Sequence, residues 1–148
     1  MDAPLNVLVV DLFTTLQMLA GYAPPTVLPE VHRVPQAEIR DRFCNGQPCE
    51  IRAVYDPTLG VFIDEKLDVH NRLFDRSILF HELVHHAQSV SGRFDLGDSA
   101  CVRRNAAEKE AYWLQNLYLM KMNDGHRVSM TGWAMRCADA EVPVTKKP

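Results

Sequence analysis

The sequence predicts a small α+β domain, in which an N-terminal helix and a small sheet containing a hairpin precede two long helices. Three observations favour this class: an apolar N-terminal run, β-type residues on both sides of a turn at Asp56–Gly60, and two long helical patterns further along. At 148 residues the chain fits a single domain over 1–148, with a frayed tail expected over about 143–148.

Composition narrows the classes of function. The chain is 47% hydrophobic and 24% charged, and its formal net charge is −3. These values are ordinary for a soluble globular protein and give no general attraction to nucleic acid or to acidic membranes. We therefore expect no nucleic-acid partner and look for function in a local site. The oligomeric state is not determined by these features.

The first element is an apolar helix over Leu5–Ala20, which we expect to end near Gly21 before two prolines. We do not expect it to span a membrane, because Asp11 interrupts the run and Thr14 and Gln17 add polarity. No basic segment precedes it, as a signal peptide would require. Whether a leader peptide was removed ahead of this helix is left open.

The next segments predict strands and one short helix. Thr26–Val34 has the composition of a strand, and its Pro29 favours an edge or irregular position. Pro35–Phe43 reads as a short helix that begins with proline. Ile51–Tyr55 and Val61–Ile63 are expected to form a hairpin around the turn between them.

Two long helices follow the hairpin. The first is expected over about Asp75–Ser91 and ends at Gly92. After a loop, the second runs over Arg103–Met122. The closing segment is expected to be a short helix or coil that packs Trp133 and Met135 inward.

The four cysteines favour two disulfides. Cys44 and Cys49 bracket the turn-forming tetrapeptide NGQP, which brings their sulfurs close together, and Cys101 and Cys137 would form the second pair. Four buried free thiols remain the alternative. Paired cysteines would favour an exported protein, periplasmic or secreted, and free thiols a cytoplasmic one. Neither pair has the spacing of a zinc site.

The pentapeptide HELVH, residues 81–85, contains two candidate metal ligands and a candidate general base. Residues four apart lie on one face of a helix, so His81 and His85 can direct their imidazoles at one metal ion. Glu82 then lies beside the ion without binding it, which is the position of a general base for a metal-activated water. The surrounding residues are mostly apolar, so the helix is expected to be buried, where a cation would compensate these polar groups. The alternative is a pair of hydrogen-bonded core histidines.

Two neighbouring side chains have other expected roles. His86 lies one step past the ligand face and is expected to be an ordinary helix residue. Gln88 lies about one turn beyond His85 on the ligand face, where it would either hydrogen-bond to a metal-ligating side chain or line a cleft.

A catalytic zinc site needs a third protein ligand. The loop carboxylates Asp95 and Asp98 are available but have no helix to orient them. The following helix offers Glu108 and Glu110. One reading of the helix faces favours Glu110, another favours Glu108, and both could instead be solvated charges near a helix N-terminus. The residues alone leave this choice open.

These motifs resemble the gluzincin-type zinc metallopeptidases, in which a glutamate on the following helix completes the His-Glu-x-x-His site. The segments AVYDPTLGVFIDE, HELVHHAQ and EKEAYWLQNLYL are also similar to those of a poorly characterised group of small exported bacterial proteins with minimal zincin-like domains. The resemblance covers about residues 50–122. Its Glu-x-x-Ala register favours Glu108, three residues before Ala111. The short spacing from His85 to Glu108 requires a tight loop.

The resemblance implies a zincin-like fold and hydrolysis of a peptide or protein substrate, with Zn²⁺ held by the two histidines and the glutamate. It implies an edge strand, Val61–Glu65, that pairs with the substrate backbone. Tyr112 would stabilise the oxyanion or simply pack as an aromatic. The alternative from another class is a zincin-fold metal-binding or structural protein without turnover. A toxin or effector with one protein target is a third reading.

Overall fold

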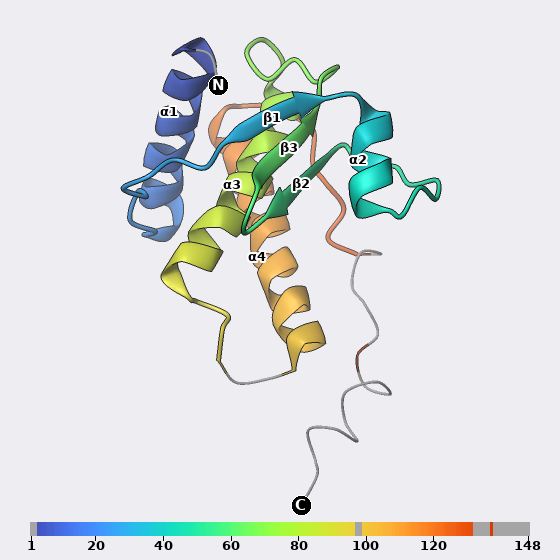
Figure 1. Cartoon of the computed structure of the whole chain (residues 1–148). Helices are drawn as coiled ribbons and strands as arrows, with labels where there is room; N and C mark the ends of the chain where they lie inside the picture. The colour runs from blue at the N-terminus through green and yellow to red at the C-terminus, as the bar shows by residue number, and fades with distance from the viewer. Residues whose placement is uncertain (1–2, 97–98, 132–136, 138–148) are drawn as a thin grey trace, which may run out of the picture.

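The computed structural model describes residues 3–96, 99–131 and 137 of the chain. Within this part the α+β prediction is confirmed (Figure 1). In chain order the elements are α1 (Ala3–Ala20), β1 (Val31–Val34), α2 (Gln36–Phe43), β2 (Ala53–Asp56), β3 (Gly60–Asp64), α3 (Leu73–Ser91) and α4 (Ala100–Lys121).

The three strands form one sheet in the order β1-β3-β2 (Figure 1). β2 and β3 are the expected antiparallel hairpin, and β1 pairs in parallel with the other side of β3. β3 is therefore the central strand. The expectation that Val61–Glu65 forms an exposed edge is wrong, because β1 occupies the position that the hairpin alone would leave open. In the described part of the chain, the edge left without a partner strand on the hairpin side is β2.

Gly60 explains how β1 reaches its place. Its φ is +100°, and a Cβ at this position would lie 2.5 Å from the carbonyl oxygen of Glu30. That oxygen accepts a hydrogen bond of 2.8 Å from the amide of Val61. Only glycine allows this conformation and this close backbone approach, so a side chain here would disturb the start of the β1–β3 pairing.

Several predicted boundaries differ from the structure. The strand expected from residue 26 is shorter, although it does lie at an edge. Pro35 precedes α2 as its N-cap residue instead of forming its first turn. α3 begins at Leu73, and α4 begins three residues early because the Oγ of Ser99 accepts a hydrogen bond from the amide of Val102. The segment containing Trp133 and Met135 lies outside the described residues.

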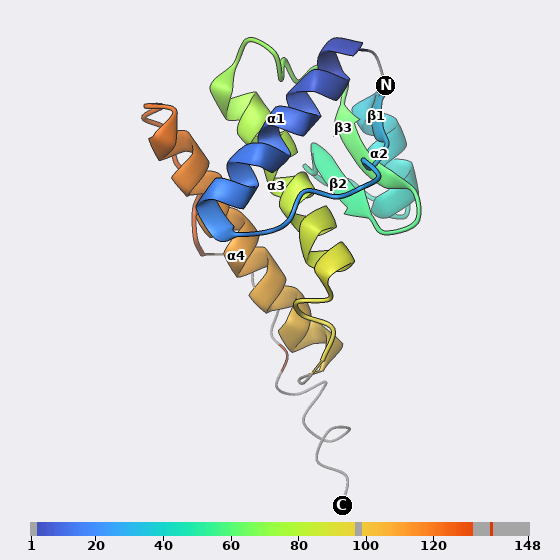
Figure 2. The same cartoon turned by 90° about the vertical axis from the view of Figure 1, so that its left-hand side faces the viewer.

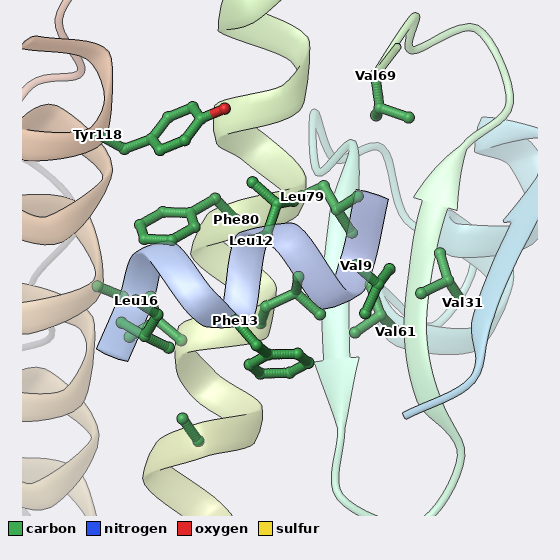
Figure 3. Packing of buried hydrophobic residues seen from close by; sticks show 14 of the residues in the cluster. Val9, Leu12, Phe13, Leu16, Val31, Val61, Val69, Leu79, Phe80 and Tyr118 are labelled. Carbon is green, nitrogen blue, oxygen red and sulfur yellow. The ribbon is translucent and has the colours of Figure 1, made fainter. Parts of the chain in front are cut away.

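The helices and the sheet stack in layers. α3 packs against the sheet on one side and against α4 on the other, and α1 crosses α3 (Figures 1 and 2). Figure 3 shows the core between them, where the rings of Phe80 and Tyr118 stack at 4.8 Å. α1 contributes residues at helical spacing, which are Leu5, Val9, Leu12, Phe13 and Leu16. α3 is thus held on several sides, which fixes the side chains it carries.

α1 also has an apolar outer side. Val7, Val10 and Met18 are exposed. By length and composition this helix is apolar enough to cross a membrane, and core helices and signal sequences share that property. Its inner side packs in the core described above.

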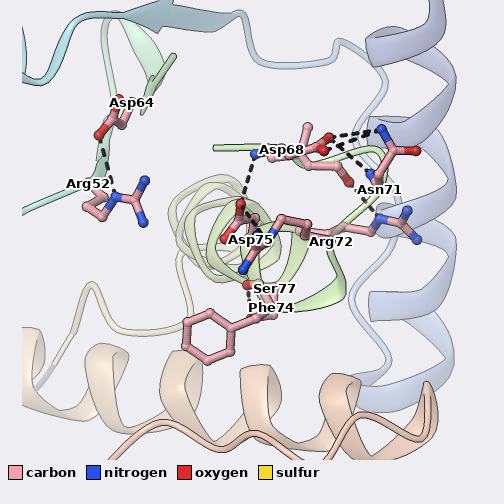
Figure 4. Close-up of polar contacts among 10 residues, drawn as sticks. Arg52, Asp64, Asp68, Asn71, Arg72, Phe74, Asp75 and Ser77 are labelled. Atoms are coloured by element: carbon pink, nitrogen blue, oxygen red, sulfur yellow. Dashed lines mark hydrogen bonds and ion pairs between the residues drawn. The ribbon is translucent and has the colours of Figure 1, made fainter. Parts of the chain in front are cut away.

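Polar contacts hold the start of α3 (Figure 4). The Asp75 carboxylate accepts a hydrogen bond of 2.9 Å from the amide of Asp68 and lies 3.8 Å from the Arg72 guanidinium. The Ser77 hydroxyl donates to the carbonyl of Phe74 at 2.6 Å. These contacts tie the connection from the sheet to the first turns of α3.

Both predicted disulfides are present, Cys44–Cys49 and Cys101–Cys137. The second ties the beginning of α4 to the segment that follows it. Disulfides persist in oxidising compartments, so this pairing indicates such an environment for the folded chain.

The two disulfides are expected to contribute unequally to stability. They close loops with sequence separations of 5 and 36 residues. Chain entropy predicts a loss of about 2 kcal/mol for the double alanine variant at Cys44 and Cys49, and about 4 kcal/mol for that at Cys101 and Cys137. Urea unfolding of both variants measures the difference. Equal losses, or the reverse order, would contradict the chain-entropy explanation.

Candidate metal centre

α3 and α4 bring three donor atoms together. His81 and His85 lie one turn apart on the side of α3 that faces α4, and Glu108 reaches back from α4. Its Oε1 lies 3.0 Å from Nε2 of His81 and 2.9 Å from Nε2 of His85. One donor atom of each residue lies within 4.8 Å of the other two, so this group could hold a metal ion.

The donor set fits zinc. Two ligand atoms at about 2.1 Å from a tetrahedral zinc ion are separated by about 3.4 Å. The observed separations from Glu108 to the two imidazoles are a few tenths of an ångström shorter, so small side-chain movements suffice. Two imidazoles and one carboxylate also leave a fourth position open, as in catalytic zinc sites.

Each imidazole is held on its other side by an amide. Nδ1 of His81 lies 3.0 Å from Oε1 of Gln115, and Nδ1 of His85 lies 2.8 Å from Oε1 of Gln88. Gln115 donates through its amino group to Ser77, and Gln88 donates to the carbonyl of Ala107. Because that carbonyl and the Ser77 oxygen act as acceptors, both amide orientations are fixed and both Oε1 atoms face the imidazoles.

These amides determine where the imidazole protons are. An amide oxygen only accepts, so Nδ1 of His81 and of His85 must each carry a hydrogen. In a neutral ring, Nε2 then directs a lone pair at the Glu108 oxygen. Two acceptors at this distance repel each other unless a proton or a cation lies between them. The outer hydrogen bonds therefore prepare both Nε2 atoms for metal binding.

Charges within the cluster shift its titration. Burial lowers the pKa of His85, but the hydrogen bond and charge of Glu108 and the charge of Glu82 outweigh it and raise this pKa to about 8. Burial raises the pKa of Glu108, yet hydrogen bonds from both histidines hold it well below its usual range. The metal-free cluster thus keeps a proton at His85 at neutral pH and a charge on Glu108.

Zinc binding is expected to release about one proton at pH 7. His85 is protonated below a pKa of about 8 in the metal-free chain, and a metal displaces that proton. Zinc affinity should therefore fall about tenfold for each pH unit below this value. Calorimetry in buffers of different ionisation enthalpy measures the released protons. A binding enthalpy independent of the buffer at pH 7 would contradict this arrangement.

Glu82 lies beside the cluster and is buried, with 8% exposure. Burial raises the pKa of its carboxyl, and the charge of Glu108 adds to this effect. The charges of His81 and His85 and a backbone hydrogen bond from Tyr55 act in the opposite direction. A carboxylate with a raised pKa in a cleft accepts a proton more readily than an ordinary one.

Tyr112 faces the same centre from α4. Its ring centroid lies 4.4 Å from that of His81. Burial raises the pKa of its hydroxyl, and the charges of Glu108 and Glu82 raise it further. The phenol consequently keeps its proton at neutral pH and can act as a hydrogen-bond donor.

Glu110 takes part in a different network, which argues against it as the third ligand. Its Oε1 accepts hydrogen bonds from the Tyr22 hydroxyl and, at 3.0 Å, from Gln88, and its Oε2 lies 3.1 Å from the Arg93 guanidinium. It therefore reaches the cluster only through Gln88, which holds His85. Of the two glutamates between which the helix faces did not decide, Glu108 is the one whose carboxylate meets both imidazoles.

Asp95 and His86 lie apart from the donor atoms of the cluster. Asp95 is exposed at the edge of the cleft, and Asp98 lies outside the described residues. His86 points away from the cluster, where its Nδ1 lies 3.2 Å from the Tyr55 hydroxyl and its ring contacts Phe13. Burial lowers its pKa. His86 is therefore a packing residue, as expected.

Two hollows meet at the cluster. One of about 630 Å³ extends toward the beginning of α4, and the other, of about 710 Å³, extends toward the segment after α4. Both are lined by Ile51, Ala53, His81, Glu82 and Tyr112. The site is thus a cleft open in two directions, with the β2 edge along its length.

Three supporting residues escaped the sequence analysis. Gln115 lies seven residues after Glu108, two turns along the same face of α4, and this spacing could have identified it. Ser77 stands four residues before His81 and could have been found in the same way. Tyr22 carries no such signal, because it reaches Glu110 from a distant part of the chain.

Comparison with known proteins gives one match. A family model described as Domain of unknown function (DUF6647) matches residues 3–142, nearly the whole chain. Searches of curated proteins and of solved structures find no match.

Proposed function

We propose that this chain, which belongs to the DUF6647 family, is a zinc-dependent metallopeptidase with a zincin-like domain. The observation that carries the proposal is the convergence of His81, His85 and Glu108 with a buried Glu82 beside them. The orientation of both imidazoles by Gln115 and Gln88 supports it, because such outer bonds are typical of metal ligands.

Bound zinc would polarise a substrate carbonyl and lower the pKa of a water molecule to about 7. The Glu82 carboxylate would take a proton from the attacking water and deliver it to the leaving amine. Its buried position suits both steps, since burial raises the pKa of this carboxyl and so makes it a better proton acceptor than an ordinary carboxylate. Tyr112, protonated and beside His81, donates a hydrogen bond to the developing oxyanion.

The peptide lies along β2. Of the two strands of the hairpin, β2 is the one with a free edge, and Ala53 and Tyr55 line the cleft beside Glu82. An extended peptide can add to such an edge through backbone hydrogen bonds. Because the cleft opens in two directions, a polypeptide can pass through it. We therefore assign internal peptide bonds as the cleavage sites.

The protein works in an oxidising compartment outside the cytoplasm. The two disulfides support this placement. A periplasmic or secreted peptidase would meet unfolded or extended polypeptides there.

The proposed function is tested by incubating the zinc-loaded protein with a mixture of unfolded proteins and identifying new N-termini by mass spectrometry. Cleavage that disappears on chelation and returns with zinc is expected. If zinc is bound stoichiometrically and no new termini form with any substrate mixture, the chain is instead a zincin-shaped binding protein without turnover. Glu82→Gln, which leaves His81, His85 and Glu108 in place, is the matched inactive control.

A further inference from the structure

We infer that the end of the cleft at the beginning of α4 binds a carboxylate of the peptide substrate, and that Arg104 is the residue that contacts it. This inference rests on the proposed peptidase function and specifies its substrate class. Peptides that place an acidic side chain or a free C-terminus at this end of the cleft would be preferred.

Arg104 is placed by helical spacing. It lies four residues before Glu108, on the same face of α4 and one turn nearer the helix N-terminus. Both residues line the hollow that contains His85 and Glu82. A substrate group bound at Arg104 would therefore lie about one helical turn, roughly 5–6 Å, along α4 from the candidate metal ligand.

The charge of Arg104 is not used within the described part of the chain. Arg52 pairs with Asp64, and Arg93 pairs with Glu110. Arg104 forms no hydrogen bond or ion pair with any described residue, and Glu108, the acid one turn away, is occupied by the two imidazoles. Its charge nevertheless reaches the site, where it lowers the pKa of Tyr112 against the stronger effects that raise it.

The cleft is electrostatically asymmetric. Arg103 and Arg104 line the end of the cleft at the beginning of α4. Asp95 is an acidic residue in the lining of the same end. At the opposite end, the cleft is lined by Glu50 and by Arg52, whose guanidinium faces Asp64. Among the described residues, Arg104 therefore leaves a positive charge without an ion-pair partner at one end of the cleft, in a chain whose net charge is −3. This asymmetry would fix the direction in which an acidic peptide lies along β2.

A carboxylate suits this position chemically. The arginine guanidinium presents a planar set of donors that matches the two oxygens of a carboxylate. Such charge-assisted hydrogen bonds exceed neutral ones in strength and geometric specificity. The carboxylate can come from an aspartate or glutamate side chain or from the C-terminus of the peptide, and the two sources are distinguished by amidation.

The test measures peptide binding by fluorescence anisotropy with zinc-loaded protein in which Glu82→Gln prevents turnover. Four matched pools of degenerate octapeptides are compared, with either glutamate or glutamine fixed at the central positions and with a free or an amidated C-terminus. We expect at least one form of carboxylate to increase affinity on the order of tenfold. The further substitution Arg104→Gln should remove this preference, and Arg104→Glu should make the carboxylate-containing pools the weaker binders.

Lys109→Gln is the matched control, because it removes the same charge from the same helix at a position that does not line the cleft. It should leave the preference intact. Equal affinity for all four pools, or a preference that survives Arg104→Glu, would overturn the inference. Zinc content is measured on the same samples, so that failure of the Arg104 inference can be distinguished from failure of the proposed peptidase function. Absence of zinc would count against the peptidase function.

Discussion

Replacing Glu108 by glutamine is expected to weaken zinc binding by at least about 100-fold, whereas Glu110→Gln weakens it by no more than about tenfold. Glu108 supplies the oxygen that meets both imidazoles, so its loss removes a ligand. Changes to residues that hold a metal ligand directly typically cost about 10- to 100-fold. Glu110 is one step further out, because it bonds to Gln88, which in turn holds His85, so a smaller loss is expected. Competition against a fluorescent zinc chelator measures both variants.

The pair is a matched comparison, because both changes remove one negative charge from the same turn of α4 and keep the side-chain size. Saturating zinc at about 1,000 times its dissociation constant should add about 4 kcal/mol to the stability of the wild type. At the same zinc concentration, a 100-fold weaker Glu108→Gln should retain no more than about 1.4 kcal/mol of this increment. If Glu110→Gln lost zinc and Glu108→Gln kept it, the ligand assignment would be wrong.

Replacing Glu82 by glutamine is expected to lower kcat by about 10²- to 10⁴-fold while zinc stays bound. The change removes the general base and keeps the shape of a side chain that is not a ligand. Steady-state kinetics on a cleaved peptide, with zinc content measured in parallel, test this expectation. Unchanged turnover in Glu82→Gln would remove this residue from the mechanism, and loss of zinc would make it a ligand.

Glu82→Gln should also change the stability of the metal-free protein. The folded pKa of Glu82 is raised, so the folded state favours the protonated carboxyl. Glu82 therefore contributes most to the free energy of unfolding at pH values below its pKa in the unfolded chain. This contribution is lost as pH rises through its pKa in the folded protein. The glutamine variant lacks this decline. Urea unfolding of both metal-free proteins at acidic and at neutral pH should show their stabilities diverging as pH rises.

The sequence predicted the parts of the fold that depend on local pattern. The periodicity of α3 and α4, the stop at Gly92 and the β2–β3 hairpin all follow from nearby residues. The parallel pairing of β1 with β3 does not, because it joins strands separated by α2 and β2 and depends on the close approach of Glu30 to Gly60. Missing this pairing led to the wrong edge strand.

The candidate site also has parts that depend on nearby residues and parts that depend on the packing of distant segments. The spacing of His81 and His85 within one helix is local, and it predicted that both would face one ion. Which carboxylate meets the two imidazoles depends on how α4 is rotated against α3. The pattern of helix faces alone did not decide between Glu108 and Glu110. The role of Glu110 became apparent only with Tyr22 and Arg93, which approach it from distant parts of the chain.

The most direct test of the central claim is a crystal structure of the zinc-loaded protein, with anomalous diffraction measured on both sides of the zinc edge. We predict one anomalous peak about 2.0–2.2 Å from Nε2 of His81, Nε2 of His85 and a carboxylate oxygen of Glu108. Glu82 should stand beside the peak without contacting it. A zinc-replete crystal with no peak at these three side chains, or with the zinc bound elsewhere, would contradict the account.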